Sequence, residues 1–285
     1  MKPFVISEDA ETLLHKWAEV RGFQLPSRAF FAGLLDEMVG MLEKIFSEVI
    51  LAEEAAISSQ LVQWVHASGL PAVSMDGVYF QSEHTIQVNR AVDQFGNDIG
   101  LFPRPGAPSL CEQCQVIKDR ELTEIVLVDD VVFSGHQIVL VIEGLADLNV
   151  RVVKVLAGIS IGMGETLLAE KGVDYVSVYP IPEVVDEICQ RDFLPGTPRC
   201  GRYLAGSKNT GLPYLLPFGN PGKWASIPEN WQLPFSQFCI DRAIRVFEAI
   251  EKESGRVVHC LDLDRKVFSL PKDGTRFVDA LRRLL

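Results

Sequence analysis

Apolar residues recur at helical spacing through residues 1–70. The longest such pattern follows Pro26, where the apolar side chains of Phe30–Val49 fall on one face of a helix, and Gly69 is a typical residue to end the next one. Ser7 stands before the first pattern, where a hydroxyl side chain caps a helix well. We therefore expect residues 1–70 to form a helical arm whose aromatic and methionine side chains pack in a core.

Strand-like and helix-like patterns alternate between residues 71 and 192. Ile125–Val128 is an unbroken apolar run of strand length, Gln137–Leu148 has helical spacing, and Arg151–Ile159 is again strand-like. A short helix and a further strand follow before residue 180. This alternation is typical of a parallel sheet with crossover helices, and the unbroken apolar strands indicate burial on both faces. The fold class predicted for residues 71–192 is therefore α/β.

Weaker patterns precede that alternation. Ala72–Phe80 and Thr85–Val92 read as strands, and the stretch from Pro103 to Pro108 indicates a long loop or hairpin. Cys111 and Cys114 come next and are the only closely spaced pair among six cysteines. No second Cys or His pair with zinc-site spacing follows, so we expect two thiols on a strand or turn rather than a metal site.

The segment Phe193–Pro228 is dense in glycine and proline and contains cations but no Asp or Glu. Two interpretations stay open. The cations and aromatic rings could bind an anion and stack on a base, or the segment could be a loop packed across the surface, with glycine and proline fixing its turns. The cations are Arg199, Arg202, Lys208 and Lys223, and the aromatic residues within and just after the segment are Tyr203, Tyr214, Trp224 and Trp231.

Helical spacing returns at Ser236–Lys252, followed by a hairpin pattern at Val257–Leu270 and a last helix to residue 285. The chain is therefore expected to have three parts. These are a helical arm at 1–70, an α/β core at 71–192 and a Gly/Pro-rich segment with a small α+β extension at 193–285.

Charge and hydropathy narrow the classes of partner that the protein is expected to bind. Lys and Arg number 27 against 38 Asp and Glu, a formal net charge of −11, which repels duplex DNA and anionic membranes. The chain has neither an apolar run long enough to span a membrane nor an apolar N-terminal leader, and its cysteines are sparse. We therefore expect a cytoplasmic protein, and the apolar N-terminal helices are compatible with a homodimer.

The strongest chemical signal follows the strand Ile125–Val128. In an open parallel sheet, ligands bind beyond the carboxyl ends of the strands. Here two carboxylates, Asp129 and Asp130, are followed by a Ser134-Gly135 turn that leads into a helix. The helix N-terminus suits a phosphate, and the acids suit sugar hydroxyls or a Mg²⁺-linked ligand. Together they predict a pocket for a ribose phosphate.

The sequence IVLVDDVVFSGHQI, residues 125–138, resembles the motif of type I phosphoribosyltransferases that binds phosphoribosyl pyrophosphate (PRPP). The resemblance implies a type I phosphoribosyltransferase-like core that uses PRPP with Mg²⁺ and transfers ribose 5-phosphate to a nitrogen nucleophile such as a nucleobase. Asp129 and Asp130 would then be the catalytic acids that hold the ribose hydroxyls. The turn that wraps the 5′-phosphate would consist of Val131, Val132, Phe133, Ser134, Gly135, His136 and Gln137.

Two features depart from that family pattern. Gln137 stands where the family commonly has a hydroxyl residue, and no short glycine-bearing pyrophosphate loop is evident after an earlier strand. Arg90 is the best placed candidate to meet the pyrophosphate, with Arg199 and Lys223 as further cations for the anionic side of the pocket.

Three alternatives to a transferase remain. A PRPP or nucleotide sensor would keep the pocket without the chemistry, and a partner-binding protein on the same fold would bind no small molecule. In the third, Asp129 and Asp130 merely end a strand, and Ser134 and Gly135 merely cap a helix.

Overall fold

The computed structural model describes residues 1–75 and 77–285 and divides the chain into two compact units. Unit 1 comprises residues 1–51, 91–99 and 185–285, and unit 2 comprises residues 52–90 and 100–184. Each unit is therefore assembled from segments that are distant in sequence, and the unit bounds fall at other positions than 70 and 192. Among the described residues, no helix is both long and apolar enough to cross a membrane.

Unit 2 is built on a five-stranded sheet in which every neighbouring pair of strands is parallel. Its order is β4-β3-β7-β8-β9. The strands are β3 (Ala72–Met75), β4 (His84–Ile86), β7 (Glu124–Val132), β8 (Arg151–Ile161) and β9 (Asp174–Ile181). Parallel strands need crossover connections, and helices supply those that link β7, β8 and β9. The predicted α/β class, with a parallel sheet and crossover helices, is confirmed.

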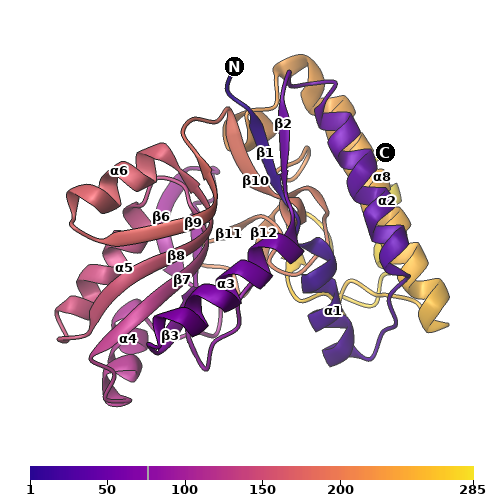
Figure 1. Cartoon of the computed structure of the whole chain (residues 1–285). Coiled ribbons are helices and arrows are strands. Elements are labelled where there is room, and N and C mark those ends of the chain that lie inside the picture. Colours follow the sequence, from indigo (N-terminus) through magenta and orange to yellow (C-terminus); the bar gives the residue numbers. More distant parts are fainter. Residues whose placement is uncertain (76) are drawn as a thin grey trace. The chain divides into compact units, whose positions relative to one another are not determined.

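Helices cover both faces of this sheet (Figure 1). On one face, α4 (Leu110–Asp119), α5 (His136–Ala146) and α6 (Gly162–Glu170) share a buried core with the central strands. On the other face, Ile57 of α3 (Glu54–Ser68) reaches the backbone of β8 at Gly158. This double cover explains why the central strands read as unbroken apolar runs.

Helix α4 corrects the prediction for the Cys111 and Cys114 region, because both residues lie on a helix and not on a strand or turn. The helix begins with a capping box, in which the Ser109 side chain accepts from the Glu112 amide and the Glu112 carboxylate accepts from the Ser109 amide. A serine followed three residues later by glutamate is a helix-start pattern that the sequence contains. The strand predicted at Ala72–Phe80 ends earlier, at Met75, and its residue 76 lies outside the described residues.

In unit 1, the N-terminal strand β1 (Phe4–Ser7) lies between β2 (Val49–Ala52) and β10 (Asp186–Cys189). Ser7 therefore belongs to a strand and donates to Glu187, so the expectation that it caps a helix is wrong. The first helix, α1 (Ala10–Arg21), follows Asp9 instead.

Helix α2 (Arg28–Leu42) packs beside the long helix α8 (Glu229–Ser254), as Figure 1 shows. Both contribute to the larger of the two buried apolar cores. A further sheet has the order β13-β12-β11-β5-β6. The remaining elements are β5 (Val88–Val92), β6 (Asp98–Pro103), η1 (Gln190–Phe193), β11 (Arg202–Leu204), β12 (Thr210–Leu212), α7 (Pro221–Ala225), β13 (Lys266–Val267) and α9 (Phe277–Arg282).

The segment Phe193–Pro228 contributes to the unit 1 core. Tyr214 and Trp224 are buried, and the Arg202 guanidinium lies over both rings while it pairs with Asp98. These groups stabilise the segment against the core, which favours the structural interpretation for them. The hairpin predicted at Val257–Leu270 is also wrong, since β13 pairs in parallel with β12.

Candidate functional site

The two acids of the PRPP-like motif lie within strand β7, which runs on to Val132 rather than ending at Val128. Asp129 is 9% exposed and Asp130 is half-buried. Oδ1 of each carboxylate accepts a hydrogen bond from the next backbone amide, at 2.9 Å in both cases. These two bonds fix the carboxylates at the carboxyl-end half of the strand, where ligands of parallel sheets bind.

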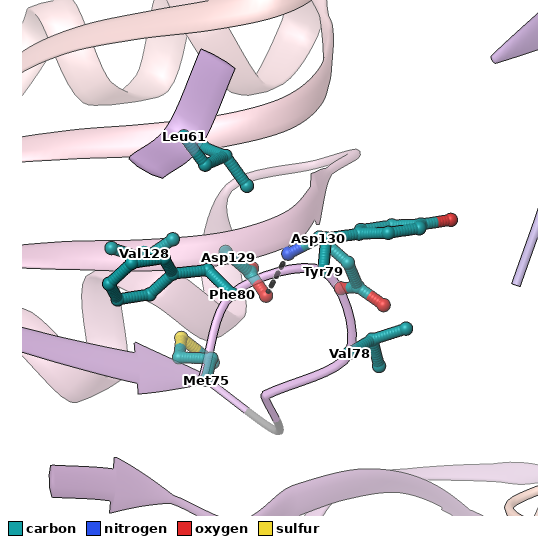
Figure 2. Close-up of a pocket in the computed structure, with 8 residues that line it drawn as sticks. All are labelled: Leu61, Met75, Val78, Tyr79, Phe80, Val128, Asp129 and Asp130. Carbon is teal, nitrogen blue, oxygen red and sulfur yellow. Dashed lines mark hydrogen bonds between the residues drawn. The ribbon is translucent and has the colours of Figure 1, made fainter. Parts of the chain in front are cut away.

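Both carboxylates line a small hollow (Figure 2). Its wall is formed by α3, by the ends of β3 and β7, and by the loop that follows β3. Figure 2 shows both carboxylates directed toward that loop. The lining residues are Leu61, Met75, Val78, Tyr79, Phe80, Val128, Asp129 and Asp130. They include two acids but neither Lys nor Arg, so an anionic ligand placed here meets negative charge.

Sequence reasoning missed the loop that carries Val78, Tyr79 and Phe80. The structure brings these residues to the acids because β3 is the direct neighbour of β7, with Ser74 opposite Val128. An available signal was the Asp76-Gly77 dipeptide directly after an apolar strand, since Asp-Gly pairs mark turns. Carboxyl ends of adjacent parallel strands meet at one edge of a sheet, so a turn there belongs with the acids.

The turn after β7 leads into α5 with its N-terminus unprotected by a side chain. Gly135 is the N-cap and makes no side-chain hydrogen bond, and the first turn of the helix contains no acid. The first amides of a helix have no partner within it, and the helix dipole adds positive potential there. Ser134 and Gln137 are half-buried beside this end and His136 is exposed. The arrangement is suited to an anion such as a phosphate.

The predicted turn residues differ in which of their atoms a ligand could contact. Val132 is 2% exposed and packs in the apolar core, so only its backbone is available to a ligand. Val131 and Phe133 are half-buried. The helix begins at His136, one residue before the predicted start at Gln137.

Gly135 has a structural role in addition to the predicted phosphate contact. Its φ is +76°, and a Cβ there would lie 3.1 Å from the carbonyl oxygen of Gly164 in the first turn of α6. A Cβ on Gly164 would in turn lie 2.7 Å from the carbonyl oxygen of Phe133. Both glycines are therefore needed for the turn to pack backbone to backbone against α6.

None of the three predicted cations outside the motif is among the residues that line the hollow. Arg90 is exposed on β5 and does not line the hollow. Arg199 and Lys223 belong to unit 1, where Arg199 is half-buried and Lys223 is exposed in α7. The described residues that line the hollow all belong to unit 2.

The described part of the chain contains no group of three or more His, Cys, Asp or Glu side chains arranged to hold a metal ion. Mg²⁺ is commonly held by one or two protein carboxylates together with substrate phosphates. Asp129 and Asp130 fit that mode of binding, in which the ligand supplies the remaining oxygens.

Comparison with known proteins gives limited similarity. No family model and no curated protein matches the chain. Among solved structures, orotate phosphoribosyltransferase from Aeropyrum pernix is 20% identical with a TM-score of 0.29, over 45% of this chain and 71% of that one. Purine phosphoribosyltransferase from Pyrococcus horikoshii is 14% identical with a TM-score of 0.29, over 48% and 86%. Adenine phosphoribosyltransferase from Thermoanaerobacter pseudethanolicus is 12% identical with a TM-score of 0.28, over 45% and 80%. At these values, function has to be inferred from the residues of this chain.

Proposed function

We propose that unit 2 is a phosphoribosyltransferase that binds PRPP with Mg²⁺ at the end of β7. The observation that carries this proposal is the succession of Asp129 and Asp130 in the hollow and a helix N-terminus without a side-chain cap only a few residues later. One ligand that presents sugar hydroxyls and, a few ångströms away, a phosphate satisfies both features.

Each group has a distinct role in the proposed reaction. Asp129 and Asp130 accept hydrogen bonds from the ribose hydroxyls, and the first amides of α5 bind the 5′-phosphate. A nitrogen nucleophile attacks the anomeric carbon and loses its proton, while the bond from that carbon to pyrophosphate breaks and the electron pair leaves with pyrophosphate. The chain accelerates this displacement by placement and by electrostatic stabilisation of the oxocarbenium-like transition state.

Magnesium would supply positive charge to the pyrophosphate at the carboxylates of Asp129 and Asp130. The need for it follows from the wall of the hollow, which has two acids and no cationic side chain among its described residues. Without a cation, two carboxylates repel a bound pyrophosphate. PRPP binding is therefore expected to depend on Mg²⁺.

Calorimetric titration of the full chain with PRPP, with and without Mg²⁺, tests the proposal. The double variant Asp129→Asn with Asp130→Asn is expected to lose Mg²⁺-dependent affinity at least tenfold and to remain folded, because asparagine has the shape of aspartate and keeps an oxygen that accepts the next backbone amide. The matched control is Asp147→Asn with Asp174→Asn, which removes the same charge near the amino ends of the strands. Absence of PRPP binding at millimolar ligand, or equal affinity in the double variant and the wild type, would contradict the ribose assignment.

A sensor without transferase chemistry is the second candidate. It is favoured by the loop facing the acids, whose described lining residues Val78, Tyr79 and Phe80 include no cationic side chain to meet pyrophosphate. Incubation with PRPP, Mg²⁺ and a panel of nucleobases separates the two candidates. Steady release of pyrophosphate rejects the sensor, and binding without release rejects the transferase.

A further inference from the structure

Helix α4 carries two thiols that the proposed function does not use. Cys111 and Cys114 are the second and fifth residues of the helix. Cys111 is exposed and Cys114 is 1% exposed. All four other cysteines of the chain are buried and belong to unit 1. Cys111 is thus the one exposed thiol among the described residues, and a second thiol lies one helical turn away.

The geometry of a helix brings such a pair within reach of a disulfide bond. Residues three apart in an α-helix have Cα atoms separated by about 5 Å, given the rise and radius of the helix. Disulfides span Cα separations of about 4.4–6.8 Å, but their Cβ atoms are closer than the roughly 5–6 Å of an undistorted helical pair. Bond formation therefore requires a tighter first turn of the helix.

The two thiols have different roles in such a reaction. Burial raises the pKa of the Cys114 thiol to about 11, and the neighbouring Cys111 adds to the increase. Cys114 is therefore protonated at neutral pH and shielded from solvent. Cys111 is accessible to an external reagent, whereas burial shields Cys114 from it.

One of the two residues between the thiols, Gln113, connects the helix to the neighbourhood of the site. Gln113 is 7% exposed, and its side-chain oxygen accepts from the Gln87 amide at 2.6 Å. Its side-chain nitrogen donates to the Gln87 carbonyl at 3.2 Å. Gln87 links β4 to β5, and β4 pairs with β3, the strand that precedes the loop of the hollow. A distortion of the first turn of α4 would therefore reach this link through Gln113.

We propose that Cys111 and Cys114 are a reversible dithiol–disulfide pair that responds to low-molecular-weight disulfides and loosens the Gln113–Gln87 connection when oxidised. The Cys111 thiolate attacks one sulfur of the external disulfide, which forms a mixed disulfide and releases one thiolate. The Cys114 sulfur, after loss of its proton, attacks Cys111 Sγ and releases the second thiolate. The protein loses two electrons and two protons, and the external disulfide is reduced to two thiols.

Incubation of the full chain with glutathione disulfide, followed by alkylation, digestion and mass spectrometry, tests the bond. The wild-type peptide that contains both cysteines is expected to lose the mass of two hydrogen atoms and to regain it with dithiothreitol. Cys114→Ala is expected to stop at a glutathione adduct on Cys111. Cys111→Ser is expected to remain unmodified at Cys114, since that thiol is buried. A wild-type protein that accumulates only the adduct, or that stays fully alkylatable, overturns the proposal.

Hydrogen exchange of the wild type tests whether oxidation loosens the Gln113–Gln87 connection. It avoids any variant that folds poorly. The Gln87 amide is expected to exchange several-fold faster in the oxidised protein than in the reduced one. The Val126 amide, which donates to the Pro71 carbonyl in the same unit, is the internal control and is expected to be unchanged. Equal exchange at Gln87 in a protein shown to contain the disulfide overturns the transmission through Gln113.

Discussion

At the scale of single residues, Gly135 combines two requirements that the sequence could not separate. A serine–glycine turn before a helix indicates a close ligand approach, and this was the basis for predicting a phosphate site. The structure adds a close approach from within the protein, because the backbone of Gly164 in α6 lies against the position that a Cβ of Gly135 would occupy. Contacts between residues 29 positions apart depend on how α6 packs, which no local pattern specifies.

Substitution of Gly135 by alanine is therefore expected to destabilise the fold as well as weaken phosphate binding. The positive φ alone costs about 1–2 kcal/mol for a residue with a Cβ. The matched control is Gly172→Ala, where φ is +68° and nothing lies within 4 Å of the added Cβ. We expect urea unfolding to show the larger loss of unfolding free energy for Gly135→Ala. Equal losses in the two variants would mean that the turn accommodates a Cβ without moving α6.

At the scale of elements, the segment Phe193–Pro228 shows why charge composition alone is a poor guide to function. Four cations without an acid indicated an anion site, but Arg202 has its partner, Asp98, more than 100 positions earlier in the chain. Its guanidinium carbon also lies 5.5 Å from the Tyr214 ring centre and 5.2 Å from that of Trp224. The sequence contains these residues but not their proximity.

Arg202→Ala is expected to lower the free energy of unfolding by about 2–4 kcal/mol, because it removes a buried guanidinium together with its ion pair and its ring contacts. Lys208→Ala removes an exposed cation from the same segment and is expected to change it by less than about 0.5 kcal/mol. Chemical denaturation measures both. A neutral Arg202→Ala would mean that the Asp98 pair and the rings contribute no net stability.

The remaining cations of that segment keep their sequence-based prediction. If Arg199 and Lys223 contribute to the anionic side of the pocket, the double variant Arg199→Ala with Lys223→Ala should weaken PRPP binding at least tenfold and flatten its salt dependence. Calorimetry at two ionic strengths measures both quantities. Identical affinities and salt slopes would remove these two residues from the proposed site.

At the scale of the whole molecule, a buried ion pair between Asp9 and Arg191 joins two segments of unit 1 that are distant in sequence. Burial raises the pKa of Asp9 from 3.8 to about 6, outweighing the opposite effect of Arg191. A raised pKa means that the folded state binds the proton more tightly than the unfolded state. The contribution of Asp9 to stability therefore falls as the pH rises from about 4 to about 6.

This pH dependence can be isolated by comparing the wild type with Asp9→Asn. The wild type is expected to lose up to about 3 kcal/mol of unfolding free energy relative to the variant over that interval, and the difference is expected to be constant above it. Denaturant unfolding at several pH values measures it, with Asp36→Asn on the exposed side of α2 as the control. A wild type that gains unfolding free energy relative to the variant as the pH rises would show that the Arg191 charge dominates.

The α/β core was predictable from the sequence because each strand and helix of Ile125–Ile159 has its own hydrophobic period. The assembly of unit 1 was not. Strand β1 is only four residues long, and what makes it a strand is its parallel pairing with Asp186–Cys189, about 180 residues later in the chain. The acids and the helix end of the candidate site were likewise local, whereas the loop at Val78–Phe80 joins them only through the sheet order.

The order in which a ribosome makes the chain gives the pairing of β1 a consequence for biosynthesis. Phe4, Val5 and Ile6 are fully buried in the finished protein, yet their partner strand β10 is synthesised about 180 residues later. All of unit 2, residues 52–90 and 100–184, emerges in that interval. Until translation reaches Cys189, this apolar strand has an unpaired edge of the kind that promotes aggregation. Premature termination between residues 184 and 189 would therefore release a chain with a complete parallel sheet and an N-terminus suited to capture by chaperones.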